Sequence, residues 1–337
     1  MSFGELLLRI CPDTEGNWLR QNSLAFYVGG AEANVATALA LWGVPSAYLT
    51  VLPDNPVARQ LVAYLGANGV DTSKILYGGA RLGLYFLPKG KDLKNTGVIY
   101  DRAYSSFSRL KPGMIDWDAV LDDVGWLHFS AISPALNPAV ADVCKEGVQA
   151  AAAKGVRVSV DLNYRAKLWQ YGVPPLAVMP GLVGYCDLVM GNLWAAEKML
   201  GIPVDERLTA GGGKEDYLEH ARLTSAAIME RFPRVRQVAK TFRFDQGENG
   251  IRYFAALYSA GELYSSREYV SAAILDKVGS GDCFMAGLIR GICRGQSPAE
   301  MLGFATAAAF QKLFIPSDAT SQRAEDIEQF ILTHEQG

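Results

Sequence analysis

The chain has 337 residues, of which half are hydrophobic and a fifth are charged, so it can bury a substantial core and does not have the composition of a disordered chain. Its formal net charge of −3 provides no basic field of the kind that binds a nucleic-acid backbone. No stretch approaches the roughly 20 apolar residues that a membrane helix needs. The five cysteines are scattered and form no CxxC pair, which fits a reducing compartment and offers no zinc site. We therefore expect a cytoplasmic protein without a nucleic-acid or membrane partner.

Strand-like and helix-like segments alternate over most of the chain. The first half gives a helix over 31–42, a strand over 47–52, a helix over 59–68, a strand over 125–133 and a helix over 138–155. Buried strands follow over 156–163 and 186–192, then a helix over 215–231, a strand over 236–242, and helices over 281–294 and 298–314. Strands separated by helices of this length predict βαβ units. We therefore expect an α/β fold in one domain over 1–337, with a mainly parallel sheet covered by helices on both faces.

Two regions break this alternation. Residues 6–12 with 23–30, and 81–88 with 97–104, have the character of strand pairs without an intervening helix, and the polar segment 89–96 joins the second pair. These pieces predict a small antiparallel sheet over one edge of the main domain. It would be a discontinuous β lid, built from about 6–30 and 81–108.

The stretch DKVGSGDCFMAG, residues 276–287, carries the strongest chemical signal. Gly279, Ser280 and Gly281 stand just before an apolar-periodic helix, so several free backbone N–H groups and the helix dipole can point at one phosphoryl group. Asp282 falls in the first helical turn, where a carboxylate can accept the proton of an attacking hydroxyl. Taken alone, an ordinary turn with a capping aspartate fits equally well. Neither a P-loop nor a Rossmann fingerprint is present.

The same stretch resembles the DTxGAGDxFxAG signature of ribokinase-like (PfkB-type) carbohydrate kinases. It departs from that signature at Lys277, Ser280 and Cys283, but the glycines and both aspartates are in place. A second family motif, GG…N, is matched by Gly29, Gly30 and Asn34. The two motifs lie in the same order, and at the same separation along the chain, as in that family.

The resemblance implies a three-layer α/β/α domain with a β lid, and transfer of the γ-phosphate of ATP to a sugar hydroxyl. Asp282 is then the general base, and the amides of Gly279 to Gly281 form the anion hole. It also implies Mg²⁺ on the ATP phosphates and, in parts of the family, a monovalent cation such as K⁺.

Nucleotide contacts are less well marked. The N-x-x-E element that the family links to its magnesium shell is only partly matched, because Asn192 is followed by Ala195 at the third position and Glu197 comes two residues later. Lys240, Thr241 and Arg243 are candidates for nucleotide contact, although a surface-exposed basic strand end is an equal reading. The helix after Pro298 and the loop 314–319 are expected to border the adenine pocket.

Three segments point to the sugar. Tyr85 stands on a lid strand, Tyr100 and Arg102 on another, and Asn163 and Arg165 at the end of a buried strand. Two arginines around a sugar favour a carboxylate, because a buried guanidinium without an anionic partner is costly. Either arginine could instead be structural, Arg102 as an exposed strand residue and Arg165 paired with a carboxylate of the protein.

This combination resembles the ketodeoxygluconate kinases of the family. The predicted reaction is phosphorylation of the terminal hydroxyl of 2-keto-3-deoxygluconate (2-dehydro-3-deoxy-D-gluconate) to the 6-phosphate. The substrate would contact residues of both motifs and all three segments, namely Gly29, Gly30, Asn34, Tyr85, Tyr100, Arg102, Asn163, Arg165 and Asp282.

Two alternatives stay open. One is a fructokinase or another neutral-sugar kinase of the same family, and the other is a sugar-binding protein that lost catalysis, which the departures at Ala195 and Lys277 leave room for. An isolated small sheet also exposes an apolar face and unpaired edges, so we expect a homodimer through the β lid.

Overall fold

The computed structural model describes residues 1–12, 22–88, 97–205, 208, 212–247 and 249–335. The polar segment 89–96 of the predicted lid lies outside these residues. Within them, one large sheet has nine strands in the order β14-β13-β12-β11-β10-β9-β1-β4, with β15 paired to β13. These strands are β1 (Ser2–Phe3), β4 (Tyr48–Leu49), β9 (Trp126–Ser130), β10 (Arg157–Asp161), β11 (Leu188–Met190), β12 (Gln237–Gln246), β13 (Gly250–Ser259), β14 (Glu262–Ser265) and β15 (Tyr269–Ser271).

The large sheet is parallel from β4 to β12, as predicted, and antiparallel beyond β12. The antiparallel edge was not predicted. Its β13–β14 hairpin turns on Ala260 and Gly261, which both have positive φ, at 52° and 87°. A two-residue loop of this kind matches the twist of paired strands. The alanine conceals the turn, because asparagine, aspartate or glycine usually marks that position.

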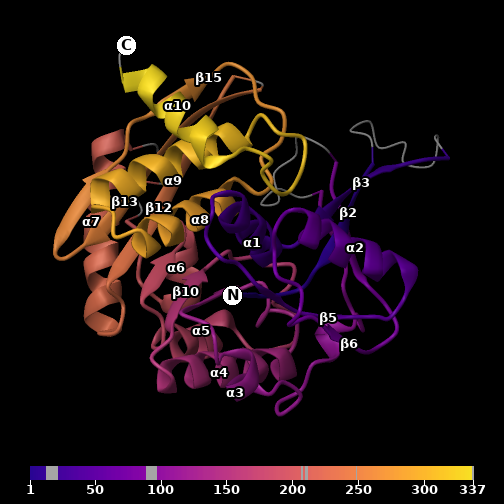
Figure 1. The fold of residues 1–337 in the computed structure, drawn as a ribbon. Coiled ribbons are helices and arrows are strands. Elements are labelled where there is room, and N and C mark those ends of the chain that lie inside the picture. Colours follow the sequence, from indigo (N-terminus) through magenta and orange to yellow (C-terminus); the bar gives the residue numbers. More distant parts are fainter. Residues whose placement is uncertain (13–21, 89–96, 206–207, 209–211, 248, 336–337) are drawn as a thin grey trace.

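Helices cover both faces of this sheet, which gives the predicted three layers (Figure 1). One face carries α1 (Ala31–Leu41), α8 (Ser280–Cys293), α9 (Pro298–Lys312) and α10 (Ala324–Glu335). The other carries α3 (Trp117–Val120), α4 (Pro138–Ala153), α5 (Pro175–Val183), α6 (Leu193–Leu200) and α7 (Lys214–Arg231). No helix in the described ranges is long and apolar enough to cross a membrane.

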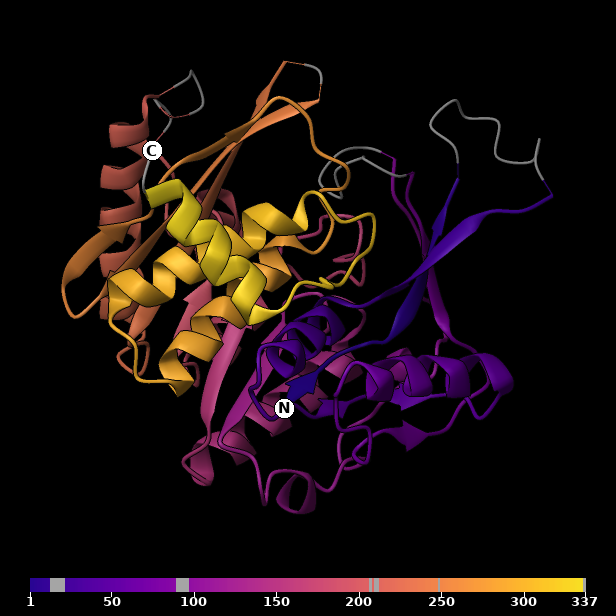
Figure 2. The ribbon, with the colours of Figure 1, turned by 45° about the horizontal axis from the view of Figure 1, so that its top comes forward.

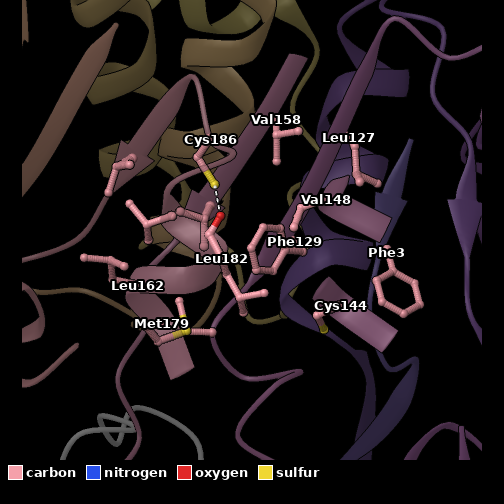
Figure 3. Packing of buried hydrophobic residues seen from close by; sticks show 14 of the residues in the cluster. Phe3, Leu127, Phe129, Cys144, Val148, Val158, Leu162, Met179, Leu182 and Cys186 are labelled. Atoms are coloured by element: carbon pink, nitrogen blue, oxygen red, sulfur yellow. Dashed lines mark hydrogen bonds between the residues drawn. The ribbon is translucent and has the colours of Figure 1, made fainter. Parts of the chain in front are cut away.

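Strand alternation supplies the core. Val189 of β11 points into the cluster under α4 to α6, whereas its neighbours Leu188 and Met190 point into the cluster under α8 and α9. Figure 3 shows part of the first cluster, where side chains of β1, β9 and β10 meet those of α4 and α5: Phe3, Leu127, Phe129, Val158, Cys144, Val148, Met179 and Leu182. Four of the five cysteines are buried, and Cys293 at the end of α8 is exposed.

A second, four-stranded sheet forms the lid, which rises to one side of the three layers (Figure 2). Its strands are β3 (Ala25–Gly29), β2 (Leu7–Cys11), β7 (Gly83–Phe86) and β8 (Ile99–Asp101), in that order. The predicted pairs β2–β3 and β7–β8 are antiparallel. Between them β2 and β7 run parallel, so the two antiparallel pairs join into one mixed sheet.

The connection between the two sheets differs in detail from the sequence prediction. Residues 47–52, predicted as one strand, divide into β4 of the large sheet and β5 (Val51–Leu52), which pairs with β6 (Leu76–Tyr77). α2 (Pro56–Ala67) begins three residues earlier than predicted, because Asn55 accepts a hydrogen bond from the Ala58 N–H and Pro56 suits the first helical position. A short 3₁₀ turn, Phe107–Arg109, follows the lid.

Candidate active site

A cavity lies at the carboxyl ends of β10, β11 and β12, between the N-termini of α1, α6 and α8 and the lid. Parallel sheets bind ligands at this edge. Most of the predicted site residues line it: Gly30, Asn34, Tyr85, Tyr100, Arg102, Asn163, Arg165, Asn192, Thr241, Arg243, Gly279, Ser280, Gly281 and Asp282. Gly29, Glu197 and Lys240 are not among the lining residues.

The predicted phosphate end of the cavity is the start of α8. Gly279 is the N-cap, with a φ of 80°, and a Cβ added there would lie 1.8 Å from the carbonyl oxygen of Asp318. Only glycine fits both conditions. The Cys283 N–H donates to the Gly279 carbonyl at 2.9 Å, which closes the first helical turn. The N–H groups before it have no acceptor inside the helix and can bind an anion.

Asp282 lies beside these amides and accepts a hydrogen bond of 2.7 Å from the Asn34 side chain. Burial raises the pKa of Asp282 to about 8; the hydrogen bond from Asn34 opposes this shift, and the charges of Asp161 and Glu32 add to it. A carboxylate of this pKa is a far stronger base than an ordinary aspartate and suits a general base near neutral pH.

Asn34 is aimed at Asp282 by the turn that opens α1. Gly30 is the N-cap of that helix, with a φ of 137°, and a Cβ there would lie 2.6 Å from the Glu5 carbonyl oxygen. Close packing of backbone on backbone therefore requires this glycine. The two family motifs thus meet at one hydrogen bond.

Arg102 lines the part of the cavity where the sugar is expected and is buried, not exposed. Its Nε atom is 2.5 Å from Glu5 Oε2, so its charge is matched inside the protein. The premise that both arginines lack a protein partner is therefore wrong for Arg102. Glu5 was missed because a lone glutamate near the N-terminus carries no sequence signal. Its second oxygen, Oε1, has no hydrogen-bond partner in the described structure.

Arg165 contrasts with Arg102. It forms no ion pair with any residue in the described ranges, and its Nη1 donates a hydrogen bond of 3.1 Å to the Tyr164 carbonyl. Burial raises the pKa of the neighbouring Tyr100, while the charges of Arg165 and Arg102 lower it. The Arg165 guanidinium is therefore placed to receive an anionic group of a ligand.

On β12, side chains alternate between the two faces of the sheet. Thr241 and Arg243 line the cavity, but Lys240 points to the face covered by α7. There, burial and then the charge of Lys240 lower the pKa of His220. Burial lowers the pKa of Lys240 to about 7. Lys240 is therefore not positioned for the nucleotide contact predicted from the sequence.

The remaining nucleotide candidates lie around the N-terminus of α6. Asn192 lines the cavity and caps this helix, accepting a 2.8 Å hydrogen bond from the Ala195 N–H. Glu197 lies further along the helix and is 3.3 Å from Lys198, away from the lining. Lys277, an unusual residue for the signature, lines the cavity and is 2.6 Å from Asp245. Of the predicted adenine border, only Asp318 reaches the cavity.

Within the described residues no group of three or more His, Cys, Asp or Glu side chains is arranged to hold a metal ion. Mg²⁺ keeps several waters and rarely sits in a cage of protein ligands, so the expectation that nucleotide phosphates hold it stays a prediction. The structure assigns no ligand set to the predicted monovalent cation, which stays a prediction.

The sequence of residues 1–322 matches the family model described as pfkB family carbohydrate kinase. The chain belongs to this family. The pfkB assignment confirms the resemblance seen in the signature and the ribokinase-like fold that it implied. Kinases of the pfkB family use ATP and Mg²⁺.

Relatives of known name fall within the same family. The 2-dehydro-3-deoxygalactonokinase of Haloferax volcanii is 26% identical over 98% of this chain and 96% of its own length. The structure of the 2-dehydro-3-deoxygluconokinase from Thermotoga maritima is 33% identical, with a TM-score of 0.88 over 98% of both chains. A ribokinase II from E. coli, solved with ATP and Mg²⁺, shares the fold at 22% identity and a TM-score of 0.75, over 99% of this chain and 98% of that one.

Proposed function

We propose that this pfkB kinase phosphorylates the terminal hydroxyl of 2-keto-3-deoxygluconate, giving the 6-phosphate. The observation that carries the proposal is Arg165, a cavity guanidinium without an acidic partner among the described residues, opposite a phosphate site that contains Asp282. A sugar acid supplies the carboxylate that this guanidinium lacks. The keto-deoxy sugar acids named for the Haloferax and Thermotoga relatives support the same substrate class.

The reaction follows from the arrangement of the cavity. The hydroxyl oxygen of the sugar forms a bond to the γ-phosphorus of ATP, the bond from that phosphorus to the ADP oxygen breaks, and the hydroxyl proton passes to Asp282. The amides at the start of α8 stabilise the charge that spreads over the transferring phosphoryl oxygens. Bound Mg²⁺ would supply further positive charge on the phosphates, and Asn192, which lines the cavity, would belong to its outer shell.

Glu5 favours one alternative, a kinase of a neutral sugar such as fructose. Because Arg102 is paired with Glu5, Arg165 alone remains for a carboxylate of the two arginines predicted to bind the sugar. The free Oε1 of Glu5 can accept a hydrogen bond from a sugar hydroxyl. An inactive sugar-binding protein is disfavoured by the intact Asp282, Asn34 and Gly279 arrangement, which such a protein would have no reason to keep.

The test is ADP release with Mg-ATP on ketodeoxygluconate, ketodeoxygalactonate, fructose, ribose and adenosine. We expect turnover on a keto-deoxy sugar acid, and a loss of about 100-fold in kcat/KM on that substrate in Arg165→Met. Arg81→Met is the matched control, because Arg81 pairs with Asp101 on the lid outside the cavity. Turnover on a neutral sugar would keep the kinase and discard the sugar acid. Sugar binding without any turnover would favour the binding protein.

We also propose that the kinase is a homodimer joined through its lids. The lid face turned away from the cavity carries Phe26 and Ile99, which are 62% and 50% exposed, on the two edge strands β3 and β8. An apolar sheet face flanked by open edges favours pairing with a second copy. Light scattering at micromolar concentration should give the mass of a dimer for the unaltered protein, and a lower mass for Phe26→Lys. A monomer mass for the unaltered protein would contradict the proposal.

Cytoplasmic location stays a prediction.

A further inference from the structure

A buried charge cluster joins the lid to the signature loop. Arg9 of β2 is fully buried, and its Nη2 atom lies 2.5 Å from Asp276 Oδ2, while Nη1 donates to Asp276 Oδ1 at 3.3 Å. Its Nε atom is 3.0 Å from Asp318 Oδ1, an ion pair in which the N–H is not aligned for a hydrogen bond. The guanidinium also lies over the ring of Tyr27, 4.8 Å from its centroid. Arg9 therefore bridges two carboxylates from the C-terminal part of the chain.

The two carboxylates have further partners from both sides. Tyr85 of the lid donates its hydroxyl hydrogen to Asp318 Oδ2 at 2.5 Å. Burial raises the pKa of Asp318 to about 6, and the charge of Arg9 opposes that shift. Burial also disfavours the charged form of Arg9, but the Asp276 hydrogen bond and the Asp318 charge outweigh it and raise the Arg9 pKa. Arg9 therefore stays charged, and its charge favours the ionised form of Asp318.

Each carboxylate is attached to one wall of the anion hole. Asp276 opens the signature stretch, and its Oδ1 accepts a 3.1 Å hydrogen bond from the Val278 N–H, one residue before Gly279. Asp318 belongs to the turn that packs on the other side, where its carbonyl oxygen meets Gly279 so closely that no Cβ fits. The Gly279 peptide is thus held between two segments that are both tied to Arg9.

We propose that Arg9 is a positioning residue for the anion hole: by holding Asp276 and Asp318 together it sets the direction of the amides that receive the γ-phosphate. This inference rests on the proposed kinase function of the loop. Because Arg9 and Tyr85 both belong to the lid, the lid takes part in shaping the phosphate site as well as covering the sugar. Arg9 itself is not among the residues that line the cavity.

The test compares a triphosphate with a diphosphate, since the proposed reaction places at the anion hole the γ-phosphate that only the triphosphate carries. Calorimetry with Mg²⁺ measures the Kd of AMP-PNP and of ADP. In Arg9→Met we expect AMP-PNP to bind about tenfold more weakly while ADP binding is unchanged. In the same variant kcat should fall about 100-fold with the sugar KM within a few-fold. Arg9→Lys, which keeps the charge but not the forked geometry, should recover part of both losses.

Arg81→Met is again the control, since it removes an arginine–aspartate pair from the lid surface and should leave all constants unchanged. A folded Arg9→Met with unaltered AMP-PNP to ADP ratio and unaltered kcat would overturn the proposal, even if its melting temperature fell. If Arg9→Met does not fold, Arg9→Met combined with Asp276→Asn removes one of the two carboxylates that lose their partner. If that double variant does not fold either, Arg9→Lys decides. An unaltered ratio of the AMP-PNP and ADP Kd values and an unaltered kcat in Arg9→Lys would contradict the positioning role of Arg9.

The calorimetric ratio needs no sugar, which separates this inference from the proposed substrate. If the unaltered protein phosphorylates none of the sugars in the panel, the proposed function fails while the AMP-PNP to ADP ratio still decides the role of Arg9. If a sugar is phosphorylated and the ratio does not respond to Arg9, the function stands and the positioning role is lost.

Discussion

The two ends of the cavity are built in different ways. The phosphate end comes from consecutive residues, Asp276 to Asp282, at the start of one helix. The sugar end is assembled from Glu5, Arg102 and Arg165, which lie on two separate parts of the lid region and at a strand end of the large sheet. A contiguous motif can be recognised in the sequence even though Arg9, Asn34 and Asp318 complete its geometry, whereas an assembled pocket depends on which charges pair after folding. The phosphate chemistry can therefore be predicted from the sequence more completely than the sugar specificity.

The largest effect should come from Asp282→Asn at the phosphate end. Loss of the base should lower kcat by about 1,000-fold or more, with little change in the KM of ATP. Stability should move the other way. The folded-state pKa of about 8 lies above that of an unfolded aspartate, so ionisation of Asp282 destabilises the fold as pH rises from about 4 to 8.

Asp282→Asn removes the cost of ionising this buried carboxylate. The substitution should therefore add about 2 kcal/mol to the free energy of unfolding at pH 8, and less at pH 6. Denaturant titrations at the two pH values measure the difference. Equal gains at both would contradict the pKa.

Gly279→Ala should be the next most damaging change. Gly113 offers a matched control, because its φ is also 80° but a Cβ there meets nothing within 4 Å. Gly113→Ala should cost about 1 kcal/mol from backbone strain alone and leave activity intact. Gly279→Ala adds the collision with Asp318 and should lower kcat about 100-fold. Similar kinetics in the two variants would mean that the contact with Asp318 does not shape the anion hole.

At the sugar end, the Glu5–Arg102 pair can be separated from Arg165. Arg102→Met strands a buried carboxylate and should cost about 3 kcal/mol of stability. Arg102→Met with Glu5→Gln should recover most of that loss, and its kcat/KM on the sugar acid should fall less than in Arg165→Met. Thermal unfolding and ADP release measure the two effects. If the double variant loses more kcat/KM on the sugar acid than Arg165→Met does, Arg102 is the residue that binds the carboxylate of the substrate.

The smallest predicted effect is a shift in pH dependence. Asn34 donates to the ionised form of Asp282, so Asn34→Ala should raise the pKa of Asp282 further above 8, by about one unit. Because the base acts deprotonated, the acid limb of kcat/KM should move to higher pH by the same amount. The pH profiles of kcat/KM for the unaltered protein and Asn34→Ala measure this shift. If the acid limb does not move, it reports the titration of a group other than Asp282.

The helices, the parallel strands and the signature loop could be predicted from the sequence, because each is encoded by a local pattern. The helices and parallel strands have apolar patterns of the right period, and the signature loop is contiguous. Strand alternation could also have separated Lys240 from Thr241 and Arg243, because residues one apart face opposite sides. The Glu5–Arg102 pair and the bridge from Arg9 to Asp318 could not be predicted. They join residues about 100 and 300 positions apart, and no local pattern records such a partner.

The end of α8 has a practical consequence for labelling chemistry. Cys283, next to the general base, is buried, and burial raises the pKa of its thiol to about 12, so alkylating reagents find no thiolate there. Cys293, ten residues on, is exposed at the far end of the same helix, about 15 Å from Cys283 along the helix axis. Maleimide dyes should therefore attach at Cys293 and leave catalysis untouched. The chain thus carries a natural attachment point for a fluorophore, at energy-transfer distance from a fluorescent nucleotide.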